Sequence, residues 1–193
     1  AVIFELNQIF GAWDVETLAN NNLLVTEFSV SRVCEYNRQG KVIWSYDKLK
    51  NPYSAQRLKN GNTLIADTFA SRVIEVTPNG EIAWLFDQDL RPFDAEVTSS
   101  GTVLIADVQH DRIIEVDRAG KIVWELANVP NAHDADRLAN GNTLVTLRNQ
   151  GQMIEVDADG KVVWELGDLS SPSDADRLPN GNNLILSGRT GEI

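Results

Sequence analysis

Short runs in which apolar and polar residues alternate recur along the whole chain, and the i, i+3, i+4 spacing of an amphipathic helix is absent. In residues 130–166 four such runs, DADRL, NTLVTL, QMIEVD and KVVWEL, predict four short strands, here called A to D. Strands A and B flank Asn140-Gly141, which predicts a tight hairpin with both turn residues at positive φ. Strands C and D flank ADG, where Gly160 can take the left-handed conformation of a second short hairpin.

The same pattern returns every forty residues without a slip, so equivalent residues form columns at forty-residue intervals. Columns of glycine, of tryptophan and of Asn-Gly pairs define the period: Gly40, Gly80, Gly120 and Gly160; Trp44, Trp84, Trp124 and Trp164; and the pairs at Asn60, Asn140 and Asn180. Four antiparallel strands in forty residues are typical of a β-propeller blade. The sequence therefore predicts an all-β fold, a β-propeller of four-stranded blades.

Five blades are visible, at about 10–46, 50–86, 90–126, 130–166 and 170–193, and the fifth is incomplete. We predict a single β-propeller domain over 1–193. Residues 1–6, AVIFEL, occupy the strand D columns, with Phe4 in the place of tryptophan, and are a candidate closing strand for the fifth blade. This closing strand would need strand C of the fifth blade as its pairing partner. Either about seven residues are missing from a five-bladed ring, or the chain is part of a longer propeller, for which 4–8 blades are usual.

Charge narrows the classes of partner. The chain has 17 basic and 28 acidic residues and a net charge of −11, which repels nucleic acid phosphates and anionic lipid headgroups. No apolar run approaches the ~20 residues of a membrane-spanning helix. We therefore expect neither nucleic acid binding nor membrane insertion. The single Cys34 stands in a column of isoleucines, which predicts a buried small side chain and leaves the compartment open.

Comparison of the blades with one another indicates an ion pair across the B–C loop. Glu27, Asp67 and Asp107 end strand B, and an arginine follows each of them five residues later, Arg32, Arg72 and Arg112. Where the acid is replaced, by Leu147 and Ser187, the arginine is replaced as well, by Gln152 and Glu192. We predict a structural acid–arginine pair in three blades. A ligand-binding role for the acids is the alternative.

The tryptophans alternate with apolar residues in strand D, as in Val42, Trp44 and Tyr46, so they share one face of the outer strand. Recurrence in every blade favours packing against the neighbouring blade. Stacking on a substrate is the alternative.

One face of a propeller carries the B–C loops and the longer D-to-A connections, and binding residues tend to lie on such loops. Both histidines fall there, His110 in a B–C loop and His133 at the start of a strand A. The column of His133 surrounds the central opening as an aromatic rim with one histidine: Trp13, Tyr53, Phe93, His133 and Ser173. Together with His110, these residues form the predicted ligand-binding face.

Acidic residues follow this rim. The next column holds Asp14, Ser54, Asp94, Asp134 and Asp174, and the column two places later holds Glu16, Gln56, Glu96, Asp136 and Asp176. Converging carboxylates could bind a hard cation such as Ca²⁺, with Asp14, Asp94, Asp134 and Asp174 as candidate ligands. The structural alternative is that the acids cap backbone amides or pair with Arg57, Arg137 and Arg177 between blades. No other cofactor is indicated.

The repeat RLxNGNTL, preceded by HD or SD and followed by IEVDxxGKVVWE, resembles the propeller repeat of bacterial and archaeal arylsulfate sulfotransferases. Less closely, the D-x-x-G-K-x-x-W pattern of Asp157 to Trp164 resembles pyrroloquinoline-quinone-type propellers. The first resemblance implies a histidine near the axis that accepts a sulfuryl group, with an arginine that polarises it, and it favours an extracellular or periplasmic location. Only His133 stands in such a motif, and Arg137 is the candidate cation on the same side of its strand.

Two functions follow. The first is a noncatalytic β-propeller scaffold that presents a loop-rich face to a protein, glycan or small-molecule ligand. The alternative is an arylsulfate sulfotransferase-like enzyme that uses His133. We expect His133 to be a single ligand-facing group, because its column supplies no second histidine and His110 lies in a loop farther from the axis.

Overall fold

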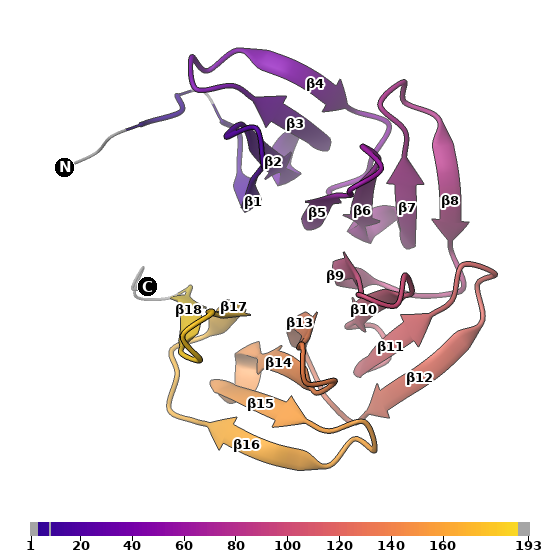
Figure 1. Ribbon diagram of the computed structural model, residues 1–193, viewed down its shortest axis with the longest axis vertical. Coiled ribbons are helices and arrows are strands. Elements are labelled where there is room, and N and C mark those ends of the chain that lie inside the picture. Colours follow the sequence, from indigo (N-terminus) through magenta and orange to yellow (C-terminus); the bar gives the residue numbers. More distant parts are fainter. Residues whose placement is uncertain (1–3, 8, 189–193) are drawn as a thin grey trace. The chain divides into compact units, whose positions relative to one another are not determined.

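The computed structural model describes residues 4–7 and 9–188, and short strands form almost all of its regular structure (Figure 1). Four antiparallel sheets have four strands each, connected in chain order. The first two sheets contain β1 (Ala12–Thr17), β2 (Leu23–Glu27), β3 (Arg32–Tyr36) and β4 (Val42–Tyr46), then β5 (Ser54–Arg57), β6 (Thr63–Asp67), β7 (Arg72–Val76) and β8 (Ile82–Phe86). The next two contain β9 (Pro92–Val97), β10 (Val103–Asp107), β11 (Arg112–Val116) and β12 (Ile122–Ala127), then β13 (Ala132–Arg137), β14 (Thr143–Leu147), β15 (Gln152–Val156) and β16 (Val162–Leu166).

A two-stranded sheet of β17 (Pro172–Arg177) and β18 (Asn183–Ser187) follows, at the place of the predicted fifth blade. These sheets are the blades of a β-propeller, so the predicted fold class is confirmed. The expected start of the next strand, at residues 191–193, lies outside the described residues, as do residues 1–3 of the candidate closing strand.

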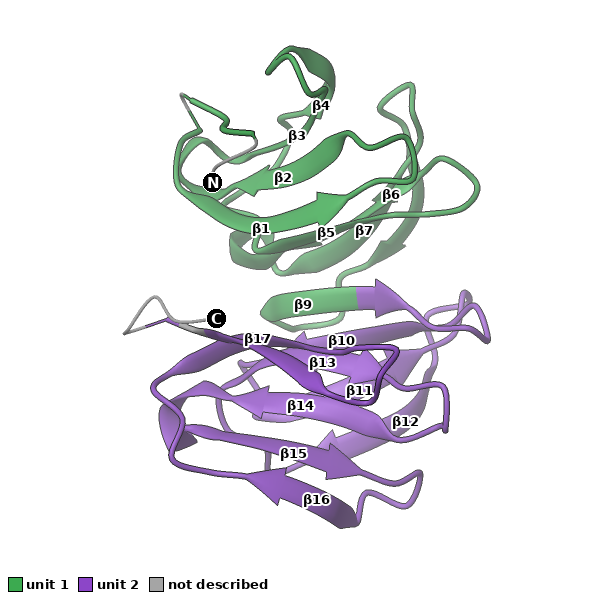
Figure 2. Cartoon of the chain, turned by 60° about the vertical axis from the view of Figure 1, so that its left-hand side comes forward, with its two compact units in different colours: residues 1–95 green, residues 96–193 purple. Residues whose placement is uncertain are grey.

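The blades fall into two compact units, residues 1–95 and 96–193, and the boundary lies inside β9 (Figure 2). In the first unit the core lies between the first two blades, where Val33 and Tyr46 pack in one cluster with Ala55 and Ile65. In the second unit, Leu104 and Ile113 of the third blade pack with Val145 of the fourth. Each core is therefore an interface between neighbouring sheets.

Residues 4–7 lie against the first blade. Leu6 packs on a cluster that contains Val25 and Cys34, and the guanidinium of Arg38 lies 5.0 Å from the centre of the Phe4 ring. Cys34 is fully buried, as its column predicted. Leu6 shares a column with Tyr46 and Leu126. Each of the three side chains lies near the C–D turn glycine of the following blade, Gly40, Gly80 and Gly160 respectively. The use of residues 1–6 as a closing strand for the fifth blade stays a prediction.

The predicted hairpins form, but one turn differs from the expectation. Gly141 has φ +89°, whereas Asn140 is not at positive φ, so the Asn-Gly pair is no two-residue turn of the predicted kind. Instead, the N–H of Leu138 donates to the carbonyl of Asn142 at 2.8 Å, and the side chain of Asn140 accepts from the N–H of Asn142 at 3.0 Å. The longer loop lets the asparagine cap the backbone from an ordinary conformation. The C–D turn is as predicted, with Gly160 at φ +78°.

The predicted acid–arginine pairs are confirmed in all three blades. Arg72 Nε donates to Asp67 Oδ2 at 2.8 Å, Arg112 Nε donates to Asp107 Oδ2 at 3.0 Å, and Arg32 Nε donates to Glu27 Oε2 at 2.7 Å. In each blade the two residues stand opposite each other in the ladder between strands B and C. All three acid side chains are fully buried, so losing an arginine would leave a buried carboxylate without its cation.

A short 3-10 turn that the sequence pattern did not predict bridges strands B and C in three blades, as η1 (Phe28–Val30), η2 (Thr68–Ala70) and η3 (Arg148–Gln150). In the described part of the chain, no helix has the length and apolar character needed to cross a membrane.

The tryptophans of strand D pack between blades as predicted where the next blade covers them. Trp124 donates its indole N–H to the carbonyl of Ala158 at 2.8 Å and lies under the guanidinium of Arg137, 4.5 Å from its ring centre. Trp44 makes the same contacts with Pro78 and Arg57. Trp164 differs, because it is 37% exposed.

Candidate functional site

A β-bulge at the start of strand A positions the side chains of the predicted rim. The pairing of β1 with β2 shifts between Ala12 and Asp14, so Trp13 stands outside the regular ladder. The same shift isolates His133 in β13 and Ser173 in β17. Since a bulge redirects one side chain without breaking the sheet, these three blades can present this residue differently from the rest of its strand.

In the first unit the rim residues are in direct contact. The ring centres of Trp13 and Tyr53 lie 4.3 Å apart, and those of Tyr53 and Phe93 also lie 4.3 Å apart with nearly parallel planes. The structure thus brings together the three aromatic members of the predicted column.

Two further rings join them from the B–C loops. Phe28 lies 5.2 Å from Tyr53, and Phe69 lies 6.0 Å from Phe28, while the guanidinium of Arg91 lies 5.6 Å from the Phe69 ring centre. Trp13 and Phe69 are each 42% exposed. Column analysis of strand A missed Phe28 and Phe69, although both follow a strand B acid in loops expected on the same face. These five rings are called the aromatic surface below: Trp13, Phe28, Tyr53, Phe69 and Phe93.

In the second unit His133 is buried, with only 7% of its surface exposed. Burial, and then the nearby positive charge of Arg148, lower its pKa from 6.5 to about 4, so the imidazole is neutral at pH 7. Ser173 is half-buried, and its hydroxyl and the guanidinium of Arg148 both lie within 4 Å of the point where a Cβ on Gly188 would stand. Little of the predicted ligand-facing histidine is open to a ligand, and its contact with one stays a prediction.

Arg148 is the cation whose charge lowers the pKa of His133, and a catalytic role for Arg137 stays a prediction. Arg137 Nη2 donates to Glu115 Oε2 at 2.6 Å, and its guanidinium covers Trp124, so it belongs to the interface between the third and fourth blades. The prediction assumed that two residues on one side of a strand share an environment, whereas β13 carries His133 and Arg137 at opposite ends. The sequence marks Arg148 as an exception, because the equivalent positions in the first three blades hold Phe28, Thr68 and Val108.

His110 is exposed and contacts the acid of an acid–arginine pair. Its Nδ1 lies 2.8 Å from Oδ2 of Asp107, the oxygen that also accepts from Arg112. This contact gives His110 a structural role at the B–C loop. Its predicted place on the ligand-binding face stays a prediction.

The acids behind the rim bind backbone amides of the following blade. The N–H of Ala55 donates to Asp14 Oδ2 at 3.0 Å, and the N–H of Ala175 donates to Asp134 Oδ2 at 3.1 Å. Ser54 replaces the acid in its column and accepts from Ala95 at 3.1 Å. The second acid column does the same, because Glu16 accepts from the N–H of Arg57 at 2.8 Å and Glu96 from that of Arg137 at 2.6 Å. These contacts match the capping alternative for Asp14 and Asp134.

The arginine side chains that follow, however, pair with a different column. Arg57 binds Glu35 at 3.1 Å, and Arg177 binds Glu155 at 2.7 Å. These acids come from strand C of the preceding blade, which the sequence analysis did not consider as a partner.

Not every acid of these columns is neutralised by a cation. Burial, together with the charges of Glu96, Asp176 and Asp174, raises the pKa of Asp136 to about 8. Partial desolvation of its carboxyl and the charge of Asp176 also raise the pKa of Asp174 in β17, and Asp94 is half-buried in β9. Among residues 4–7 and 9–188, no group of three His, Cys, Asp or Glu side chains is placed to hold a metal ion. A calcium site at Asp14, Asp94, Asp134 and Asp174 therefore stays a prediction without a ligand cluster behind it.

Comparisons with known proteins support the propeller repeat that the sequence predicts. Residues 69–191 match the family model described as outer membrane protein assembly factor BamB, a pyrroloquinoline-quinone-type repeat family. No characterised protein sequence matches the chain. The resemblance to arylsulfate sulfotransferases stays a hypothesis.

Three solved structures show the fold that the chain shares. A protein of unknown function from Bacteroides caccae is 22% identical with a TM-score of 0.66, over 81% of this chain and 67% of that one. Streptogramin B lyase is 12% identical with a TM-score of 0.76, over 95% and 65%. A catalytically inactive histidine variant of virginiamycin B lyase from Staphylococcus aureus, with quinupristin, is 14% identical with a TM-score of 0.74, over 96% and 66%. The chain thus spans about two thirds of each neighbour's length.

Proposed function

Because the chain belongs to the family described as outer membrane protein assembly factor BamB, we propose that it is a noncatalytic β-propeller scaffold that binds a polypeptide at the aromatic surface of its first unit. The observation that carries this proposal is the contact of five aromatic rings at the B–C loops and strand A starts, two of them 42% exposed. The family description names an assembly factor, which favours a protein partner over a glycan or small molecule.

Exposed aromatic rings in contact are a binding surface on physical grounds. A large ring buries 150–250 Å² when covered, and stacked or edge-on pairs add about 1 kcal/mol beyond that area. Tyr53 and Phe93 are already stacked, so little side-chain entropy is lost when a partner covers them. Arg91 over Phe69 adds a cation at the margin. The surface therefore suits apolar and aromatic side chains of an extended peptide.

An array of immobilised peptides tests this proposal, with the purified chain as the probe. We expect binding to peptides rich in aromatic and aliphatic residues, and a loss of roughly tenfold or more in affinity for Trp13→Ala and Phe69→Ala. The matched control is Ile43→Ala, which removes an apolar side chain of similar exposure (52%) from β4. Equal binding by all four proteins, or binding to a glycan array alone, would contradict a polypeptide partner at this surface.

A second candidate function is that of an arylsulfate sulfotransferase-like enzyme with His133 as the nucleophile. It is favoured by a neutral imidazole beside the guanidinium of Arg148, and one structural neighbour is a lyase whose histidine variant is inactive. Burial of His133 opposes it, because a nucleophile must reach its substrate. We expect no sulfuryl adduct when the chain is incubated with 4-nitrophenyl sulfate. A histidine-linked adduct in mass spectra, absent from His133→Ala, would establish the enzyme instead.

A further inference from the structure

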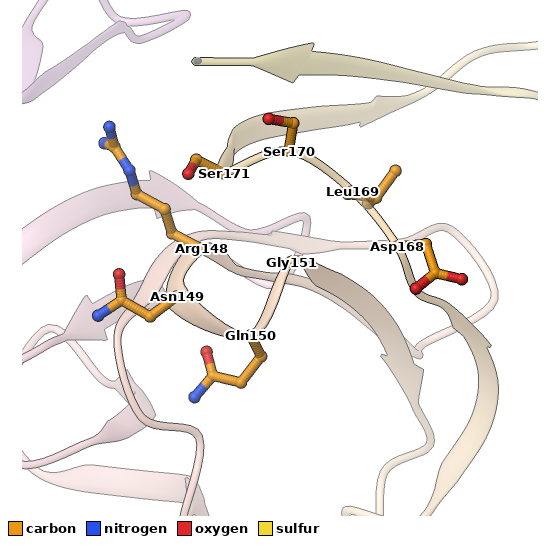
Figure 3. A pocket seen from close by; sticks show the side chains of 8 residues that line it. All are labelled: Arg148, Asn149, Gln150, Gly151, Asp168, Leu169, Ser170 and Ser171. Carbon is orange, nitrogen blue, oxygen red and sulfur yellow. The ribbon is translucent and has the colours of Figure 1, made fainter. Parts of the chain in front are cut away.

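A polar pocket of about 510 Å³ in the second unit lies between the B–C loop of the fourth blade and the connection to β17 (Figure 3). Arg148, Asn149, Gln150 and Gly151 line one side, and Asp168, Leu169, Ser170 and Ser171 line the other. The lining residues thus carry a guanidinium, a carboxylate, two carboxamides and two hydroxyls, and of these the guanidinium supplies only hydrogen-bond donors.

The guanidinium of Arg148 differs from those of three other arginines in the second unit. Arg112, Arg137 and Arg177 each bind a carboxylate within 3.0 Å. For Arg148 the described part of the chain supplies no ion pair. Its side chain points toward Ser171, and Asp168, the acid of the pocket, lies at the opposite end (Figure 3). Among residues 4–7 and 9–188, the half-buried Arg148 therefore lacks the anion that those three arginines have.

The backbone holds the two sides of the pocket together. The N–H of Leu169 donates to the carbonyl of Gly151 at 2.9 Å, and a Cβ on Gly151 would stand 2.4 Å from the Leu169 carbonyl oxygen. Gly151 also has φ +61°, so only glycine fits here without strain. On the other side, the carbonyl of Ser171 accepts from the N–H of Gly188 at 3.1 Å. The pocket is therefore preformed, which lowers the entropic cost of binding.

We propose that this pocket binds an oxyanion group, a carboxylate, sulfate or phosphate, with Arg148 as the principal ligand. A guanidinium presents two parallel N–H donors that match two oxygens of such a group, and the nearby Ser171 hydroxyl can donate to a remaining oxygen. In the first unit the column of Arg148 holds Phe28, part of the aromatic surface. The same position in the blade thus contributes a ring in one unit and a cation in the other. The oxyanion site does not depend on the proposed peptide binding.

Titration followed by ¹⁵N–¹H NMR of the full chain tests the site. Sodium acetate, sulfate and phosphate are the probes, at constant ionic strength against sodium chloride. We expect saturable shifts of the amides of Asn149, Gln150 and Ser170 with at least one oxyanion and none with chloride. Strongest binding by acetate would indicate a carboxylate ligand, and strongest binding by sulfate or phosphate a tetrahedral anion.

Arg148→Gln should weaken binding roughly tenfold or more, and Arg148→Lys should weaken it less, because lysine keeps the charge and loses the paired donors. The matched control is Arg118→Gln, which removes the same charge from an exposed arginine of the same unit and should leave affinity unchanged. Spectra of the free variants show whether the fold is kept. Absence of saturable shifts with all three oxyanions, or equal affinity for Arg148→Gln and wild type, would overturn the proposal.

Discussion

Acid should destabilise the chain through one buried histidine, His133. Burial, and then the charge of Arg148, lower the pKa of this imidazole to about 4 in the folded state, whereas an unfolded chain has the ordinary value of 6.5. Between these two values the unfolded state binds a proton that the folded state does not. The contribution of His133 to stability is therefore intact above pH 6.5 and falls as the pH is lowered toward 4.

The pKa difference sets the magnitude. One pKa unit corresponds to 1.36 kcal/mol, so lowering the pKa from 6.5 to about 4 removes about 3 kcal/mol from the free energy of unfolding between pH 7 and pH 4. His133→Gln has no such proton to bind. Relative to wild type, the variant should therefore lose about 3 kcal/mol less over this range, even though the substitution itself costs stability at pH 7.

Urea unfolding at several pH values, followed by circular dichroism, measures this difference, because the titration of carboxylates is common to both proteins. His110→Gln serves as the control, since His110 is exposed and is the other histidine of the chain. The ring proton signals in NMR give the pKa directly. Parallel stability profiles for wild type and His133→Gln, or a His133 midpoint near 6.5, would refute this account.

Four further predictions concern packing, charge, backbone and metal. Trp124→Ala should cost about 3 kcal/mol in chemical denaturation, because the indole packs between blades, and Trp164→Ala clearly less; equal losses would contradict that packing. Arg72→Met should cost about 3 kcal/mol by leaving Asp67 buried without its cation, and a neutral result would show that this pair is not structural. Gly151→Ala should lower the thermal midpoint by several degrees, because its Cβ would meet the Leu169 carbonyl oxygen, and an unchanged midpoint would disprove the close approach. The thermal midpoints of unfolding with calcium and with chelator should coincide, and a higher midpoint with calcium would support the predicted cation site.

The sequence predicted the blades because the forty-residue columns repeat the requirements of one local structure. Gly160 and Trp124 recur for reasons internal to a blade or to its contact with the next, so comparing four copies identified both. The acid–arginine pairs were found in the same way, because Asp67 and Arg72 disappear together in other blades. Periodicity thus reports what every blade needs.

Features that differ from one blade to the next were harder to predict from the sequence. Arg137 was assigned to His133 on strand alternation, but its partner Glu115 comes from another blade, and pairing between blades leaves no signal within one repeat. The low exposure of His133 depends on side chains that surround it in three dimensions. Arg148 was visible as an exception in its column, yet a single exception does not reveal which residues lie opposite it.

A hydrogen bond joins the side chain of one strand A to a backbone amide of the next strand A. This repeated contact also affects how such chains evolve. Asp134 accepts from Ala175, just as Asp14 accepts from Ala55, so each repeat has an acceptor on one side and a donor on the other. Like a head-to-tail interface between subunits, this contact is directional and does not depend on which repeat comes next. Gene duplication or deletion of forty codons would therefore join compatible faces at the new junction. A lineage of this kind can change its number of repeats without first inventing a new interface.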